Sequence, residues 1–338
     1  MKRILFYSSV NSLELFKTQK FYQIDISILK DLGYDVLLSN RIFDSLLFWK
    51  YDILFSYFYR YSFFAALLAK CFGKKTYFTG RIDSLDSDYA SAFNYKIQAL
   101  FFKLCYWVAD SCIIVSQSDL KNIFKVSSLK KKLSYSEHVI NTKLFIADVP
   151  KEKIFTSIVW MGDEGNVVRK GVDKALQIFA ELKKIPEFVD YRFVIIGRKG
   201  EGEVLVRSII DKYNLKGSVE LKGEVSEEDK INLLKQSKYY FQLSLYEGFG
   251  LAALEALCAN NIIIHSGKGG LANPIYKEQL LFDIDNDFDS ELLKLVNKLA
   301  CFTPITSYDN LLEYYDIQRR KDDFEAIIVN GKSNYKLK

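Results

Sequence analysis

Two glutamates separated by seven residues form the clearest chemical pattern in this sequence. They stand in SLYEGFGLAALEALCANN as Glu247, which precedes Gly-Phe-Gly, and Glu255, which lies in an Ala- and Leu-rich helical stretch. A helix that begins at about Leu251 offers unpaired N–H groups and a positive dipole end, which suit a diphosphate. Glu255 has the chemistry to accept two hydrogen bonds from a vicinal diol such as a ribose. The spacing alone leaves another interpretation open, in which Glu247 caps the helix and Glu255 is solvated.

The elements around this stretch alternate between strands and helices. YYFQLSL is an apolar strand that leads into Glu247, and similar strands are expected at RILFYSS, YDILFSYF, KKTYFTG, FTSIVWMG and YRFVIIG. Helical patterns separate them, so the series predicts parallel sheets flanked by helices. The series restarts near Pro150. We therefore expect an α/β protein with two doubly wound, Rossmann-like domains facing a cleft, with ligands at the carboxyl ends of the strands.

The chain of 338 residues is long enough for these two domains. We expect an N-terminal Rossmann-like domain at residues 1–148 and a second Rossmann-like domain at 149–315. The segment 316–338 is expected to be a C-terminal helix or tail that packs back on the N-terminal domain.

A longer region resembles a known family. Residues 244–270 resemble the signature of the family 4 retaining glycosyltransferases of GT-B fold, with a second glutamate after seven residues, an apolar strand and Gly-Gly. Upstream, WMGDEGNVVRKGVDKALQIFAEL, FVIIGRKGEGE and VELKGEVSEEDKINLLKQSKYYFQLSLYEGFG are similar to successive segments of that family. The resemblance covers residues 155–285 well and the N-terminal domain only loosely. It implies that the domain at 1–148 binds the acceptor and that the domain at 149–315 binds the nucleotide sugar.

The resemblance implies roles for individual residues. Glu255 would bind the ribose hydroxyls of a nucleotide sugar, and Glu247 would contact the donor sugar near its reacting carbon. Lys170, with Arg169 beside it, would neutralise the diphosphate that leaves, where preorganised positive charge helps most. Further donor-binding positions are Gly248, Phe249, Gly250, Leu251, Gly197, Arg198 and Lys222.

The sequence departs from the family pattern at several places. Gly162-Asp163 replaces the usual Gly-Arg, so Arg169 is expected to substitute for the missing arginine. The first loop, SSVNSLELFKTQK, has no glycine, and Asn273 stands where the family often places a glutamate. Where a histidine is common, TYFTGRID offers Arg81 and Asp83. These two residues and Asn11 of the first loop are the acceptor-side candidates, with a plain loop role as the alternative.

Charge and aromatic residues are unevenly distributed. Residues 1–150 hold 20 Lys and Arg against 13 Asp and Glu, and FWKYDILFSYFYRYSFF has ten aromatics in seventeen residues. This composition suggests a membrane surface carrying anionic lipid, or a lipid-diphosphate acceptor, as a partner of the N-terminal domain. Core packing alone would also explain many of the aromatics. The small charge excess and the lack of a recognition motif argue against nucleic acid.

Metal and disulfide chemistry are not expected. The five cysteines sit among apolar neighbours without C-x-x-C pairs, which favours buried free thiols in a reducing compartment. His138 and His265 are far apart, so a zinc site is improbable. Asp86-Ser87-Asp88 imitates a metal-binding Asp-x-Asp but lies in a polar loop without further support. No apolar run reaches the roughly 20 residues of a spanning helix.

The predicted function is that of a metal-independent, retaining glycosyltransferase of hexosyl or N-acetylhexosaminyl type. It would need no cofactor and would transfer sugar from a nucleotide-diphosphate donor, with UDP expected, to a hydroxyl of a lipid-linked or growing glycan in bacterial surface polysaccharide synthesis. A cytoplasmic location, peripheral on the inner face of the cell membrane, is expected. Two alternatives stay open: a non-catalytic subunit that scaffolds a partner, and a nucleotide-sugar epimerase or hydrolase on the same fold.

Overall fold

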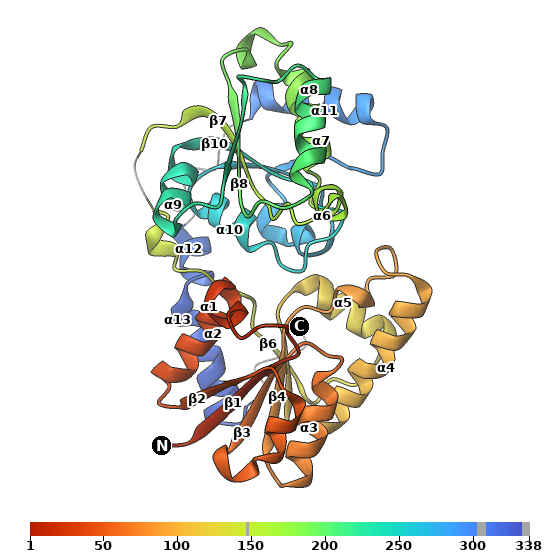
Figure 1. The fold of residues 1–338 in the computed structure, drawn as a ribbon, viewed down its shortest axis with the longest axis vertical. Helices are drawn as coiled ribbons and strands as arrows, with labels where there is room; N and C mark the ends of the chain where they lie inside the picture. Colours follow the sequence, from red (N-terminus) through yellow and green to blue (C-terminus); the bar gives the residue numbers. More distant parts are fainter. Residues whose placement is uncertain (147–148, 303–308, 333–338) are drawn as a thin grey trace. The chain divides into compact units, whose positions relative to one another are not determined.

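The computed structural model describes residues 1–146, 149–302 and 309–332, which form two compact units (Figure 1). The first unit comprises Met1–Ile140 together with the chain from Tyr314 on, and the second comprises Asn141–Glu313. The expected boundary at residue 148 lies outside the described residues. The contacts divide the chain earlier, between Ile140 and Asn141.

The first unit is built on a six-stranded parallel sheet in the order β2-β1-β3-β4-β5-β6. Neighbouring strands pair in parallel throughout. Each strand is a short apolar run, as a sheet covered on both faces requires. The strands are β1 (Arg3–Ser8), β2 (Asp35–Ser39), β3 (Ile53–Tyr57), β4 (Lys75–Thr79), β5 (Ser111–Ile114) and β6 (Leu133–Tyr135).

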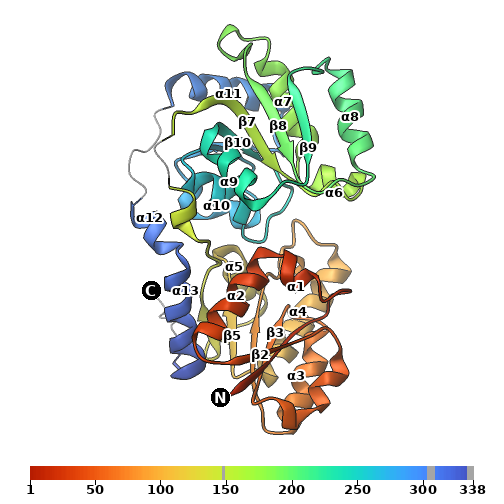
Figure 2. The same cartoon turned by 60° about the vertical axis from the view of Figure 1, so that its left-hand side comes forward.

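Helices cover both faces of this sheet because successive strand side chains point to opposite sides. Ile4 and Phe6 pack with α2 and with residues of the C-terminal segment, whereas Leu5 and Tyr7 pack with α3, α4 and α5. The two groups of helices are visible on either side of the sheet in Figure 2. The helices are α1 (Leu15–Thr18), α2 (Lys20–Asp31), α3 (Ser62–Cys71), α4 (Ala92–Val108), α5 (Gln117–Val126) and α13 (Ile317–Phe324), with 3₁₀ turns at Ile42–Leu46, Phe48–Lys50 and Asp83–Leu85 and a π turn at Glu325–Val329. The 3₁₀ turn at Thr142–Leu144 and α12 (Asp309–Tyr314), except for Tyr314, belong to the second unit.

A buried ion pair fastens the C-terminal segment to this unit. Arg320 of α13 donates from Nε and Nη2 to the two oxygens of Asp25 on α2, at 2.7 and 2.8 Å, and both side chains are fully buried. Nη1 of Arg320 also donates to the carbonyl oxygens of Ser136 and Glu137. The guanidinium is therefore satisfied on several sides, as a buried charge requires.

The second unit repeats the architecture with the strand order β12-β11-β10-β7-β8-β9, again parallel throughout. One face packs against α7, α8 and α11, and the other packs against α9, which has α10 beside it. The elements are β7 (Glu152–Ile158), α6 (Glu164–Arg169), α7 (Val172–Leu182), β8 (Arg192–Ile196), α8 (Glu203–Lys212), β9 (Val219–Gly223), α9 (Glu227–Gln236), β10 (Ser237–Gln242), α10 (Leu251–Cys258), β11 (Ile262–His265), β12 (Leu280–Leu281) and α11 (Phe288–Cys301), with 3₁₀ turns at Pro186–Phe188, Gly269–Ala272 and Pro274–Tyr276.

The parallel, doubly wound sheets expected from the sequence are confirmed, and one detail of the cysteine prediction is wrong. Cys105, Cys112 and Cys258 are buried free thiols, but Cys71 is exposed because it forms the last turn of α3. The side chain of Cys301 lies outside the described part. In the described ranges, no helix has the length and apolar character needed to cross a membrane.

Candidate functional site

The candidate site of the second unit lies at the carboxyl edge of its sheet, where the loops that follow four neighbouring strands meet. β10 leads to Glu247, β7 to the loop at Met161–Asp163, β8 to Gly197 and β9 to the start of α9. In open parallel sheets this edge is where ligands bind. The following side chains are brought there by strands that are adjacent in space but far apart in sequence.

Glu247 lies at the centre of a polar network. Its Oε2 accepts hydrogen bonds from Nζ of Lys170 at 2.6 Å, Oγ of Ser244 at 3.2 Å and Nε2 of Gln242 at 3.3 Å. Gln242 is itself oriented, because Tyr240 donates to its Oε1 and its Nε2 donates to Ser244. The carboxylate is 12% exposed, so it is fixed in position but open on one side. The simple helix-cap interpretation of Glu247 is wrong, since Gly250 occupies the cap position of α10.

Lys170 reaches Glu247 because of the turn between α6 and α7. Asp163 caps the first turn of α6 through a hydrogen bond from the backbone N–H of Asn166, and Lys170 ends that helix. Gly171 follows with φ 68°, and a Cβ there would lie 2.0 Å from the carbonyl oxygen of Leu243. Only glycine permits this approach, which brings the lysine beside the strand that delivers Glu247.

The first turn of α10 begins directly behind Glu247. Gly250, the cap residue, adopts φ 90° before Leu251 and has no side chain with which to cap this turn. The first N–H groups of a helix have no partner within the helix and are available to a ligand. The predicted diphosphate contacts Gly248, Phe249, Gly250 and Leu251 all lie in this stretch. Gly270 fixes the loop in position, since its N–H donates to the carbonyl oxygen of Glu247 at 2.5 Å.

Glu255 forms a second ion pair at this edge. Nζ of Lys230 on α9 lies 2.8 and 2.7 Å from its two oxygens. The side chain of Glu255 is 5% exposed and that of Lys230 is 15% exposed. The interpretation of Glu255 as a solvated helix residue is therefore wrong. A buried carboxylate with a fixed cation beside it is a preorganised polar site.

The other donor-side candidates are more peripheral. Arg169 is half-buried and donates to Oδ1 of Asn166 at 3.2 Å, and Arg198 is exposed just beyond β8. Gly197, with φ 134°, closely approaches the backbone of Val159. Lys222 lies on β9, 3.8 Å from Glu220, at the outer strand of the sheet. The structure therefore brings Lys170 to Glu247, and leaves Arg198 and Lys222 on the periphery.

The chain between β7 and α7 contains the short helix α6. Asn273, which stands where the family often places a glutamate, has a local function. Its Oδ1 accepts a hydrogen bond from the N–H of Ile275 and caps the 3₁₀ turn at Pro274–Tyr276.

The acceptor-side candidates lie in the first unit, at the carboxyl edge of its sheet. Arg81 and Asp83 come together, with Nε 3.2 Å from Oδ2. Asn11 lies in a separate hollow of about 520 Å³, which it lines together with Arg41, Glu14 and Asp44 after β1 and β2. Leu13 and Leu38 also line this hollow, and its polar side chains suit hydroxyl groups.

Two buried or half-buried residues near the candidate sites, Asp119 and Lys230, were not predicted from the sequence. Asp119 is fully buried, accepts a hydrogen bond from the N–H of Ile82, and has a pKa raised to about 8, chiefly by burial and then by the charge of Asp83. Its place as the third residue after the helix cap Ser116 suggested only capping. Lys230 also gave no signal beyond a charged helix. The described residues contain no group of three or more His, Cys, Asp or Glu side chains arranged for a metal ion.

Part of the chain is similar in sequence to known glycosyltransferases. Residues 165–299 match the family model of glycosyl transferases group 1. This match contains Lys170, Glu247 and Glu255. Over 163 residues, 42% of the chain, the sequence is 32% identical to the GDP-mannose:cellobiosyl-diphosphopolyprenol alpha-mannosyltransferase of Xanthomonas oryzae pv. oryzae. Over 215 residues, 62% of the chain, it is 25% identical to one component of the phosphatidylinositol N-acetylglucosaminyltransferase of Arabidopsis thaliana. The chain spans 40% and 46% of the lengths of these two relatives.

Solved structures identify the fold as GT-B. HepE of Anabaena in complex with UDP-glucose superposes with a TM-score of 0.74 at 12% identity, covering 98% of this chain and 100% of that one. Sucrose-phosphate synthase of Thermosynechococcus elongatus gives a TM-score of 0.66 at 16% identity, covering 98% and 97% of the two chains.

Proposed function

We propose that this protein is a retaining glycosyltransferase that moves a sugar from a nucleotide-diphosphate sugar to a hydroxyl of a lipid-linked or growing glycan. The observation that carries the proposal is the pairing of Glu247 with Lys170 beside the first turn of α10, whose cap residue is a glycine. A carboxylate, a cation and a helix N-terminus therefore lie together. The carboxylate can accept hydrogen bonds from the sugar hydroxyls, and the cation and the N–H groups of the helix can bind the negatively charged diphosphate.

In this proposal each part of the nucleotide sugar has a partner in the second unit. The two oxygens of Glu255 accept hydrogen bonds from the ribose hydroxyls, and Lys230 supplies the counter-charge beside that buried carboxylate. The backbone of Phe249–Leu251 holds the diphosphate, and Glu247 holds the sugar. Lys170, with Arg169 nearby, neutralises the charge that develops as the diphosphate leaves, where stabilisation accelerates the reaction most.

The proposed reaction takes place on one face of the sugar. The bond from the anomeric carbon to the diphosphate oxygen breaks, and the acceptor oxygen forms a new bond to that carbon on the same side. The acceptor proton passes to an oxygen of the leaving diphosphate, so the products are the glycoside and the nucleoside diphosphate. With lysine, arginine and a helix end as counter-charges, we expect transfer to continue in the presence of EDTA.

The nucleotide and the acceptor are parts of the same proposal. UDP remains the expected donor nucleotide, and HepE, the neighbour of the same fold, is complexed with UDP-glucose. GDP is the second candidate, because the name of the Xanthomonas relative specifies GDP-mannose. That name also specifies a diphosphopolyprenol-linked acceptor, which supports a lipid-linked acceptor in bacterial surface polysaccharide synthesis. A cytoplasmic location beside the membrane fits such substrates.

The first test is nucleotide binding, measured by calorimetry with UDP, GDP and ADP on the wild type, Glu255→Gln and Glu181→Gln. Glu181 of α7 is a matched control, since it pairs with Lys184 on the surface. Glu255→Gln is expected to weaken binding by about 10- to 150-fold, because it replaces charged hydrogen bonds worth about 1.5–3 kcal/mol. Equal affinity of all three proteins would exclude the ribose role, and no binding of any nucleotide would favour the scaffold alternative.

The second test is the reaction itself. Incubation with a nucleotide sugar and a synthetic polyprenyl-diphosphate glycan is expected to give a product whose anomeric configuration matches that of the donor, read by NMR. Lys170→Met is expected to lower the rate by at least about 100-fold. An inverted product would refute retention. Free sugar or an epimerised donor formed without any transfer would support the hydrolase or epimerase alternative.

A further inference from the structure

The amino edge of the first sheet gathers four separate chain segments. Because its strands are parallel, the residues just before β3, β4, β5 and β6 all lie at the same edge. These segments are 48–51, 72–75, 107–110 and 130–132, and together they are named the amino-edge patch. None of the candidate site residues belongs to it.

The patch exposes large aromatic side chains. Trp49 is 59% exposed and Trp107 is 68% exposed, and these are two of the three tryptophans in the chain. Phe48 stacks on Phe72 with ring centroids 4.2 Å apart, and Trp49 packs edge-on against Phe48 at 5.2 Å. The exposed rings are thus supported by one another across segments. Tryptophan at a water-facing surface is typical of proteins that meet the interface of a bilayer.

The same segments are strongly basic. They contain Lys50, Lys74, Lys75, Lys130, Lys131 and Lys132 against Asp110, and the exposed Asp52 lies directly before β3. The oxygens of Asp110 accept from Nζ of Lys70 at 2.9 and 3.0 Å and from the N–H of Thr76, and Asp52 accepts from the N–H of Arg3. The net field at this edge is therefore positive, which complements an anionic surface.

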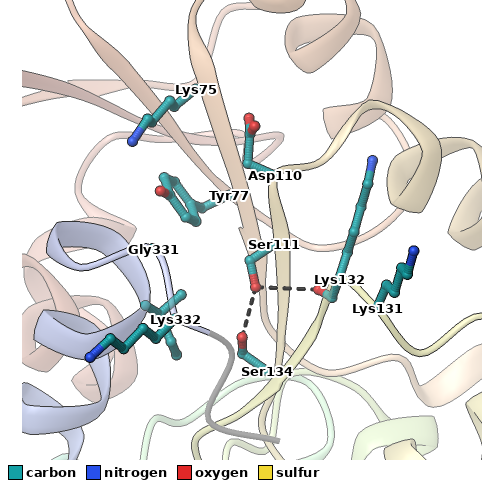
Figure 3. Close-up of a pocket in the computed structure, with 10 residues that line it drawn as sticks. Lys75, Tyr77, Asp110, Ser111, Lys131, Lys132, Ser134, Gly331 and Lys332 are labelled. Atoms are coloured by element: carbon teal, nitrogen blue, oxygen red, sulfur yellow. Dashed lines mark hydrogen bonds between the residues drawn. The ribbon is translucent and has the colours of Figure 1, made fainter.

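A hollow of about 240 Å³ lies within the basic part of the edge. Figure 3 shows Lys75, Lys131, Lys132 and Lys332 around it, with Ser111 and Ser134 at its centre. The lysine side chains point in different directions and do not converge on one point. Nζ of Lys132 donates to the carbonyl oxygens of Tyr106 and Trp107, which ties the charge to the end of α4. Separated charges suit several headgroups in a plane better than one bound ion.

We propose that the amino-edge patch docks the first unit on a bilayer that contains anionic phospholipid. Trp49 and Trp107 enter the interface between headgroups and acyl chains, and the lysines contact the phosphates around them. The insertion of the two tryptophan rings and the attraction of the lysines to the lipid phosphates are each weak, and stable peripheral binding requires both. Vesicle binding needs no nucleotide sugar, so this proposal and the proposed transfer reaction stand or fall separately.

The test is co-sedimentation of the full chain with vesicles of phosphatidylcholine, with and without phosphatidylglycerol, at low and high salt. The wild type is expected to bind only the anionic vesicles, and less at high salt. Lys130→Gln/Lys131→Gln is expected to weaken binding by about 30-fold, at about 1 kcal/mol for each lysine. Trp49→Ser/Trp107→Ser is expected to weaken it by about tenfold or more. Because these side chains are exposed, thermal unfolding is expected to stay as in the wild type.

Matched controls lie outside the amino-edge patch, on the carboxyl side of the first unit. Phe93→Ser removes an exposed ring, 72% accessible, from the first turn of α4, about 20 Å from Trp107. Lys17→Gln/Lys96→Gln removes two exposed charges at the carboxyl side. Both controls are expected to bind as the wild type does.

Four results would overturn the proposal. These are equal binding to neutral vesicles, an equal loss in patch and control variants, and displacement by inorganic phosphate at constant ionic strength, which indicates a single-anion site. The fourth is a concentration-dependent dimer in light scattering that the patch variants abolish, without vesicle binding, which indicates a second copy of this chain as the partner.

Discussion

Replacing Lys230 with methionine tests the buried pair that holds Glu255. Methionine keeps the length and apolar stem of lysine but removes its charge, so the Glu255 carboxylate, 5% exposed, loses the cation 2.7 Å away. Breaking a buried pair by removing one partner costs about 3–5 kcal/mol. Lys230 is 15% exposed, which lets some water reach the site. We therefore expect a loss of about 3 kcal/mol in the free energy of unfolding at pH 8.

The loss is expected to depend on pH. At pH 5 the unpaired carboxyl can bind a proton, which removes the buried charge, so the difference from the wild type shrinks. Urea unfolding at pH 5 and pH 8 measures both values. Lys17→Met is the control, since Lys17 and Glu14 are each 69% exposed and their pair contributes less than about 1 kcal/mol.

The double variant Lys230→Met/Glu255→Gln separates stability from binding. With no buried charge left, it is expected to recover most of the lost stability while nucleotide affinity stays low. A loss below about 1 kcal/mol for Lys230→Met, or an equal loss at pH 5 and pH 8, would refute the reasoning that Lys230 compensates Glu255.

Three further predictions concern buried groups. The pKa of Asp119 is raised to about 8, so its contribution to stability is complete below pH 4 and is lost as the pH rises toward 8. The stability of the wild type relative to Asp119→Asn is therefore expected to fall between pH 5 and pH 9 in urea titrations, and a constant difference would contradict this. Asp25→Ala strands the buried Arg320 and is expected to cost about 3–5 kcal/mol in thermal unfolding, whereas a loss under 1 kcal/mol would show that α13 is held otherwise. Gly171→Ala places a methyl 2.0 Å from the carbonyl of Leu243 and is expected to destabilise the protein by more than about 1 kcal/mol, with normal unfolding as the contrary result.

The sheets were predictable because each strand is an apolar run bounded by turn residues. β10 and β11 are read directly from YYFQLSL and IIIH, and the glycines after them mark the turns. β6 was not predicted. It has only three residues and directly follows three lysines, and so short a strand shows no clear alternation of apolar and polar residues. α6 was also missed, because six residues with one glycine carry little helical pattern.

The partners of the candidate residues were less predictable than the residues themselves. The pattern around Glu247 and Glu255 was local, so the sequence indicated where a site lies. Lys230 is 25 residues from Glu255, and Arg320 is 295 residues from Asp25, so only the folded sheets bring each pair together. An acid on the apolar side of α2 was the one available sign that Asp25 needs a distant partner.

The length of the strands in the first unit has a consequence for substrate choice. β3 and β4 have five residues each, so about 17 Å separates the amino-edge patch from the edge that carries Arg81 and Asp83. If lipid lies against the first edge and the acceptor hydroxyl is held at the second, the length of the strands fixes the distance between the lipid and that hydroxyl. Glycans too short to span that height would stay out of reach, however well their last sugar fits. Chain length, set by the number of residues in a strand, would then select the acceptor before any side chain contacts it.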